Sequence, residues 1–306
     1  MATATEPQPA QPATAATERA TAVMPPGRRS RRSRRLGPLL GLSLGALVFL
    51  FPFYYMVIGA LQREPNSDVS GAFPNPANLT LDNLRDIDQA IDLPRTLLNS
   101  GIFTGGVLLS TLLLGLLAGY ALARLEFRGK GMVFNAMLLV LIVPFQVLMI
   151  PLYVMIVRGY LLGDTYLGMI LPFAVNATAV FIFRQFFLQL PRELFESARL
   201  DGASELKILT RIAVPLAKPA ILTAVILTFI GPWNEFLWPF LVTKQLALQP
   251  LAVALANFIS NVAARQANPF GAILAGAVVL TIPAVALFLV FQKRFQASNL
   301  GSGIKG

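Results

Sequence analysis

The stretch ESARLDGASELKILTRIAVP, residues 196–215, differs from everything around it. It carries six charged residues and a central glycine and ends in a proline, whereas the flanking sequence consists of long apolar runs. Leu194 and Ala198 lie four residues apart and give a first helix an apolar face. Gly202 then permits a chain reversal at low cost, and Pro215 interrupts the helix that follows. The pattern predicts two short helices joined at Gly202.

The composition is that of a membrane protein. Of the 306 residues, 55% are hydrophobic and 13% are charged, against about 25% charged residues in soluble domains. The chain has no cysteine and no histidine, which removes thiolate and imidazole metal ligands and the commonest general base. No phosphate-binding G-x-x-x-x-G-K-[ST] run is present. These observations argue against a hydrolytic or metal-dependent enzyme, and we expect no catalytic residue and no metal site.

Six charge-poor segments are long enough, or nearly so, to cross a bilayer. A helix needs about 20 residues to span the hydrocarbon core, and isolated strands cannot satisfy their backbone groups in lipid. The sequence therefore predicts an all-α polytopic membrane protein with six transmembrane helices. We expect these spans at about 37–61, 97–123, 131–157, 165–187, 219–243 and 268–292.

The charge distribution predicts the orientation. The net charge is +10, and six arginines cluster between Arg28 and Arg35, directly before the first apolar run. With the N-terminus inside, most of the 25 Lys and Arg residues fall on the cytoplasmic side, as the positive-inside rule requires. Both termini are then cytoplasmic. We expect a disordered basic tail at 1–35, a transmembrane domain at 36–295 and a cytoplasmic tail at 296–306.

The spacing within residues 191–215 resembles a known signature. Glu-Ser-Ala, three residues, Gly, nine residues, Ile, one residue and Val-Pro resembles the "EAA" signature of ABC importer permeases. Ser197 and Val214 replace the usual Ala and Leu. The resemblance implies a type I ABC importer permease fold with cytoplasmic coupling helices that dock on a separate ATPase. The residues implied in this coupling are Glu196, Ser197, Ala198, Asp201, Gly202, Ala203, Ile212 and Pro215.

Further segments are similar to the carbohydrate-importer branch of that family, namely ANLTLDNLRDI (77–87), GPWNEFLWPFLV (231–242) and GSGIKG (301–306). The resemblance implies a permease subunit that passes a sugar or oligosaccharide inward through a bacterial or archaeal cell membrane. The implied partners are a second permease subunit, a cytoplasmic ATP-binding subunit in two copies and an extracytoplasmic solute-binding protein. The chain itself would bind no cofactor, because ATP and Mg²⁺ are used by the ATPase.

Polar residues within the expected spans are candidates for the substrate pathway. Glu235 is ionisable inside the fifth expected span, which marks it as a functional candidate. An interfacial aromatic belt is the alternative explanation for its surroundings. The candidates are Gln146, Asn176, Trp233, Asn234, Glu235 and Trp238. The rival function is an ATP-independent secondary carrier or channel, which would be active as an isolated chain.

Overall fold

The computed structural model describes residues 36–66, 68–262 and 269–301. Within these ranges the chain is helical, and β pairing is limited to an isolated bridge between Gln62 and Leu79. The predicted all-α architecture is therefore confirmed for the described residues. The expected N-terminal tail at 1–35 and the last residues of the C-terminal tail, 302–306, lie outside them.

The helical elements comprise α-helices together with short 3₁₀ and π segments, which are marked η. In chain order they are α1 (Leu36–Ala60), η2 (Val69–Ala72), η3 (Pro76–Asn78), α2 (Asp82–Ile91), α3 (Leu93–Arg124), α4 (Lys130–Val140), α5 (Phe145–Tyr153), η4 (Val154–Gly159), α6 (Tyr166–Ile170), η5 (Leu171–Phe173), α7 (Ala177–Gln189), α8 (Arg192–Leu200), α9 (Glu205–Ile208), η6 (Leu209–Ala213), α10 (Val214–Leu216), α11 (Lys218–Asn234), α12 (Leu237–Val242), η7 (Leu246–Leu248), α13 (Leu251–Asn257), η8 (Phe258–Val262) and α14 (Phe270–Gly301).

The chain divides into two compact units at Phe51. The described part of the first unit is the beginning of α1, an apolar helix whose large side chains, including Leu40 and Phe49, are exposed. The second unit begins at Pro52 and contains the rest of α1 and all later elements. All contacts discussed below lie within this second unit.

Three described helices are long and apolar enough to cross a membrane unbroken: Gly37–Ala60, Leu93–Arg124 and Phe270–Gln292. Three further helix pairs pass the same test but are bent, by 98° between α4 and α5, by 49° between η5 and α7, and by 77° between α10 and α11. If each bent pair is one span, the described residues hold up to six spans. The expected segments 131–157 and 165–187 are therefore not straight helices.

Each bend has a local cause in the sequence. Pro144 precedes α5 and disfavours helical geometry at the residue before it. Asn176 adopts an extended conformation and accepts a hydrogen bond from the Ala179 N–H at 3.0 Å, which begins α7 anew. Pro219 stands in the first turn of α11 and has no N–H to donate to the carbonyl four residues earlier, so α10 does not continue into α11 as one helix.

The expected fifth span, 219–243, is interrupted near its end. Helix α11 stops at Asn234, and α12 begins at Leu237 after Glu235 in an extended conformation. The Glu235 carboxylate accepts the N–H of Trp238 at 3.1 Å. This interaction stabilises a new helix start in the way that N-capping carboxylates do.

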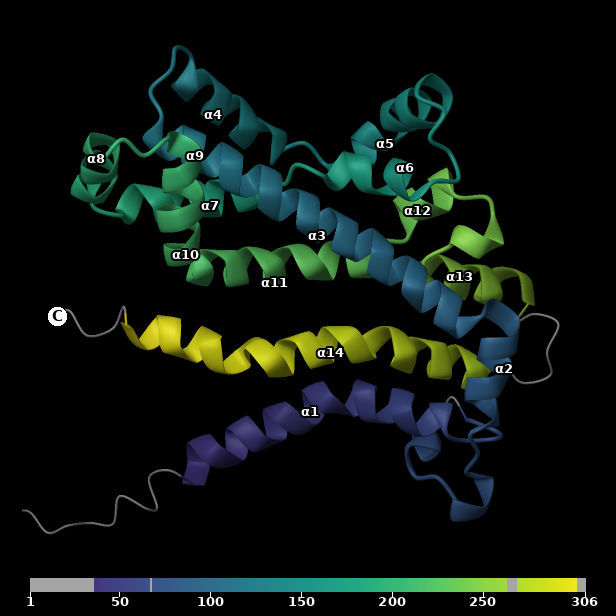
Figure 1. Ribbon diagram of the computed structural model, residues 1–306. Coiled ribbons are helices and arrows are strands. Elements are labelled where there is room, and N and C mark those ends of the chain that lie inside the picture. Colours follow the sequence, from purple (N-terminus) through teal and green to yellow (C-terminus); the bar gives the residue numbers. More distant parts are fainter. Residues whose placement is uncertain (1–35, 67, 263–268, 302–306) are drawn as a thin grey trace, which may run out of the picture. The chain divides into compact units, whose positions relative to one another are not determined.

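The long helix α3 organises the second unit. It packs along α7 and α11, with α8 and α9 near one end and α2 and α13 near the other (Figure 1). Gly119 makes the close contact with α7 possible, since a Cβ atom there would stand 2.6 Å from the Cβ of Phe183 and 3.0 Å from the backbone N of Arg184. Small residues at such crossings allow two backbones to approach closely.

Candidate functional site

The predicted helix–turn–helix is built from α8 and α9, which we call the α8–α9 hairpin (residues 192–208). Gly202 has a φ of +77°, its N–H donates to Arg199 O at 3.0 Å, and the Ala203 N–H donates to Ala198 O at 3.0 Å. This pair of bonds around a left-handed residue is a Schellman motif, which is why a glycine stands at this position. Ser204 then caps α9.

One face of the hairpin is buried against α3 and α7. Phe195 is buried, and its ring packs against the ring of Tyr120. The Tyr120 ring also contacts the Phe187 ring edge to face, with 5.7 Å between the centroids. Ile208 and Ala198 complete this apolar contact. The hairpin is therefore packed onto the ends of two membrane helices and does not project freely.

Arg124, the last residue of α3, also stabilises the contact of the hairpin with α3 and α7. Its guanidinium Cζ lies 4.2 Å from the centroid of the Phe195 ring. It also donates hydrogen bonds to the carbonyl oxygens of Phe187 and Leu190 at the end of α7. A cation at a helix C-terminus satisfies carbonyls that have no partner within the helix.

A polar contact connects three elements at Glu205. The Tyr120 hydroxyl of α3 donates to Glu205 Oε2 at 2.6 Å, and Arg199 Nε of α8 donates to Glu205 Oε1 at 2.7 Å. The Arg199 guanidinium, which hydrogen-bonds this carboxylate, lowers the pKa of Glu205, although partial burial opposes the shift. The Glu205 carboxylate in turn raises the pKa of Arg199. Both groups are thus held in their charged forms.

The opposite face of the hairpin is open. Leu200 is 89% exposed and Leu206 is 64% exposed, although both are large apolar side chains. Glu196 and Asp201 are exposed beside them. Of the other predicted coupling residues, Ser197, Gly202 and Pro215 are exposed, Ala203 and Ile212 are half-buried, and Ala198 faces inward. The signature thus forms a surface with carboxylates and apolar side chains together.

Five of the six candidate pathway residues make hydrogen bonds within the chain, namely Asn176, Trp233, Asn234, Glu235 and Trp238. Trp233 Nε1 donates to Leu280 O at 2.8 Å, and Trp238 Nε1 donates to Gly168 O at 3.2 Å. Both indoles are buried. Asn234 is exposed and donates to Ile230 O at 3.0 Å within its own helix. Gln146 is exposed on α5.

These six residues do not line a cavity that lies in the described part of the chain. That cavity, of about 510 Å³, lies between the α2–α3 junction, η7, α13 and η8. The polar side chains of its lining are Gln89, Asp92, Arg95, Thr96, Gln249, Asn257 and Asn261. Sequence reasoning did not identify it, because its walls come from segments about 150 residues apart, as the hydrogen bond from Asn99 Nδ2 to Gln249 O illustrates.

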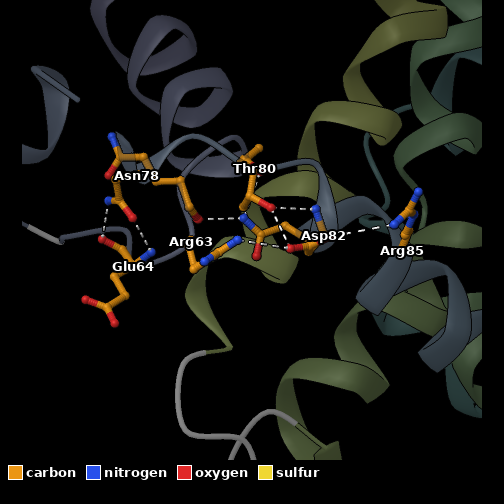
Figure 2. Close-up of polar contacts among 9 residues, drawn as sticks. Arg63, Glu64, Asn78, Thr80, Asp82 and Arg85 are labelled. Atoms are coloured by element: carbon orange, nitrogen blue, oxygen red, sulfur yellow. Dashed lines mark hydrogen bonds and ion pairs between the residues drawn. The ribbon is translucent and has the colours of Figure 1, made fainter. Parts of the chain in front are cut away.

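A second polar cluster lies in the segment between α1 and α3 (Figure 2). The Asn78 amide exchanges hydrogen bonds with the backbone N–H and carbonyl of Glu64, and Thr80 Oγ1 donates to Asp82 Oδ2 at 2.7 Å. Asp82 also lies 3.9 Å from both Arg63 and Arg85. These ion pairs are exposed, and such pairs contribute about 0–1 kcal/mol each. These contacts therefore define the conformation of this segment but add little to the free energy of folding.

Sequence reasoning also missed Tyr120, Arg124 and Glu205. A signal was present for the first two, since they lie four residues apart at the end of an apolar run and thus on one helix face. Glu205 follows the signature glycine but is not part of the signature. Its role depends on a partner 85 residues away in sequence.

Comparison with known families shows to which family the chain belongs. Residues 111–299 match the family described as "Binding-protein-dependent transport system inner membrane component". The chain belongs to this family. It is therefore the permease component of a transport system and is not a catalytic subunit, and the importer-permease family expected from the sequence is confirmed.

The sequence similarity to individual relatives extends over most of the chain. It is 34% identical over 280 residues to the arabinooligosaccharides transport system permease protein AraQ of Bacillus subtilis (strain 168), covering 89% of this chain and 96% of that protein. It is 37% identical over 254 residues to the trehalose transport system permease protein SugB of Mycobacterium tuberculosis, covering 81% of this chain and 90% of that protein. It is 30% identical over 260 residues to the sn-glycerol-3-phosphate permease UgpE of Escherichia coli, covering 83% and 92%.

A solved structure shares the fold. A chain of a bacterial ABC transporter involved in the import of the acidic polysaccharide alginate superposes with a TM-score of 0.74 at 24% identity, covering 87% of this chain and 98% of that one. The predicted importer-permease fold is thereby confirmed.

Proposed function

We propose that this chain is one of two membrane subunits of an ATP-driven importer that passes a sugar or oligosaccharide inward. Support for the substrate class comes from the relatives, whose names specify arabinooligosaccharides, trehalose and lactose. The similarity to a glycerol-phosphate permease extends the range to small polyhydroxylated solutes. Gln146, Asn176, Asn234 and Glu235 remain the candidate contacts of this chain with the solute, whereas Trp233 and Trp238 would act by shaping the helices.

The α8–α9 hairpin carries the proposal, because it is anchored on one face and open on the other. A cytoplasmic ATP-binding subunit would dock on the open face, where Leu200 and Leu206 need burial and Glu196 and Asp201 offer charge. Two copies of that subunit, one for each permease, would bind and hydrolyse ATP with Mg²⁺. Their movement would reach the membrane helices through Glu196, Ser197, Ala198, Asp201, Gly202, Ala203, Ile212 and Pro215.

The orientation follows from the same assignment. With the α8–α9 hairpin in the cytoplasm, both termini are cytoplasmic, and the α2–α13 end faces outward. An extracytoplasmic solute-binding protein would then meet the segment between α1 and α3. The chain is a multi-pass protein of a bacterial or archaeal cell membrane in this scheme.

A pull-down tests the proposal. The tagged chain is extracted from native membranes in mild detergent, and the proteins that accompany it are identified and assayed for ATP hydrolysis. We expect a soluble ATPase and a second permease. Gly202→Trp should abolish the ATPase association, because Trp is strained at positive φ and places a large ring on the docking face. Gly202→Asn is the matched control, since Asn tolerates the left-handed region.

The opposite result has a clear meaning. If the chain comes out alone, and reconstituted chain moves a solute in response to a sodium or proton gradient without ATP, it is a secondary carrier. The Gly202→Trp variant must insert into the membrane as well as the unmodified chain does. Only then can its association with the ATPase be compared with that of the unmodified chain.

A further inference from the structure

Glu205 stands where the α8–α9 hairpin meets α3. Each carboxylate oxygen takes one partner, Oε2 the Tyr120 hydroxyl at 2.6 Å and Oε1 the Arg199 Nε at 2.7 Å. Tyr120 belongs to the last turns of α3, Arg199 to the end of α8 and Glu205 to the start of α9. One side chain thus connects three helices.

The covalent backbone does not join α3 directly to the hairpin. The hairpin is joined covalently to α7 before it and, through η6 and α10, to α11 after it. Helix α3 ends at Arg124, far from the hairpin in sequence. Within the described ranges, the hydrogen bond between Tyr120 and Glu205 is the one that joins α3 to the hairpin. Apolar packing in one core cluster and the cation–π contact of Arg124 accompany it.

The geometry restrains this bond closely. Tyr120 is 3% exposed, and its ring is fixed by Phe187 and Phe195, so the direction of its hydroxyl is set by packing. Arg199 holds the carboxylate from the other side. A donor and an acceptor fixed in this way resist relative movement of α3 and α9, because a short displacement breaks a charge-assisted hydrogen bond.

We propose that Glu205 and Tyr120 are positioning residues that make α3 follow the hairpin. A displacement of the hairpin by the ATPase then moves the end of α3 with it, and through α3 the α7 and α11 helices that pack along it. This inference rests on the proposed function. The signature residues are implied in docking of the ATPase, whereas Tyr120 and Glu205 face the membrane domain.

The test uses the complete transport complex in lipid nanodiscs, with the second permease, the ATPase and the binding protein. ATP hydrolysis is measured with and without solute-loaded binding protein, and solute uptake per ATP is measured in proteoliposomes. Tyr120→Phe removes the hydroxyl and keeps the ring. We expect basal hydrolysis to persist while stimulation by loaded binding protein falls about fivefold or more, the lower end of typical coupling between sites.

Further variants distinguish a positioning role of Glu205 and Tyr120 from a general effect on the stability of the complex. Glu205→Ala, which also removes the Arg199 bond, should lose at least as much stimulation as Tyr120→Phe. The double variant should be no worse than Glu205→Ala, since the bond between Tyr120 and Glu205 is already lost there. Glu205→Gln keeps an acceptor and should restore part of the stimulation. Tyr160→Phe, at an exposed tyrosine on another segment, is the control for loss of a hydroxyl. A merely structural defect would lower the yield of complex and leave the stimulation ratio unchanged.

A distance measurement provides an independent readout. The chain has no cysteine, so spin labels can be placed at Glu126→Cys, just after α3, and Glu193→Cys, in the first turn of α8. We expect their separation to stay constant on ATP binding in the unmodified background and to change in Tyr120→Phe. Unchanged stimulation and an unchanged separation in Tyr120→Phe would overturn the inference. If the unmodified chain recruits no ATPase, the proposed function fails first.

Discussion

The guanidinium of Arg124 lies over the ring of Phe195, with 4.2 Å from Cζ to the ring centroid, and joins the end of α3 to the face of α8. The same guanidinium donates to two carbonyl oxygens at the end of α7. A single side chain thus holds the three helices whose ends meet beneath the proposed docking face, and it gives the hairpin a fixed base.

Arg124→Ala should loosen the hairpin without unfolding the membrane domain. The substitution removes a cation–π contact and the guanidinium hydrogen bonds to Phe187 O and Leu190 O, and hydrogen bonds to charged groups contribute about 1.5–3 kcal/mol each. We expect increased hydrogen exchange in residues 192–208 and weaker retention of the ATPase. Arg128→Ala, at an exposed arginine just beyond α3, should leave both unchanged. Equal exchange in the two variants would contradict this role for Arg124.

Gly119→Val should separate α3 from α7. The new Cβ would lie 2.6 Å from the Cβ of Phe183, and the nearby backbone of Arg184 cannot rotate away. Overpacking of this kind costs about 1–3 kcal/mol. We expect a lower midpoint of thermal unfolding in detergent. Gly101→Val lies on the same helix with nothing within 4 Å of its Cβ position, and it should shift the midpoint little. A normal midpoint for Gly119→Val would mean that the two helices can move apart freely.

The sequence allowed the helical membrane architecture and the α8–α9 hairpin to be predicted because both depend on local patterns. Charge-free runs identify apolar helices, and a glycine at a fixed distance from Glu196 identifies the turn. The bends at Pro144 and Asn176 were not predicted, since proline in a span does not by itself show where helices separate. The bond between Tyr120 and Glu205 depends on tertiary packing, which residue spacing does not encode.

The tryptophans illustrate the same limit. Trp233 and Trp238 were predicted as pathway residues. In the structure each indole N–H is used by a backbone carbonyl of another helix or segment of the same chain. A buried indole with its N–H satisfied stabilises helix packing, and composition alone cannot distinguish that use from a ligand contact.

Glu235 offers a direct test of its two interpretations. Its carboxylate accepts the Trp238 N–H at 3.1 Å, and Gln can accept the same bond. If its main role is to begin α12, Glu235→Gln should transport normally, whereas Glu235→Ala should lower stability by about 0.5–2 kcal/mol, the usual range for loss of a capping side chain. Uptake assays and thermal unfolding of both variants distinguish the roles. Loss of uptake in Glu235→Gln with unchanged stability would place the charge in the solute path.

Asn83 should control the order of the segment between α1 and α3. It is buried, and its Nδ2 donates to Ala60 O at 2.9 Å and to Gln62 O at 2.7 Å, so it connects the end of α1 to α2. Asn83→Ala leaves two buried carbonyls without this donor, which costs about 1–3 kcal/mol for an unsatisfied group. We expect faster proteolysis within residues 61–91 in intact right-side-out vesicles.

The matched control for Asn83→Ala is Asp86→Ala, at an exposed position of the same helix. Its cleavage rate should equal that of the unmodified chain, because no buried partner is lost. If the segment is the docking region for the binding protein, Asn83→Ala should also weaken stimulation of ATP hydrolysis by loaded binding protein, while basal hydrolysis is retained. Rapid cleavage with full stimulation would show that the order of this segment is not needed for that contact.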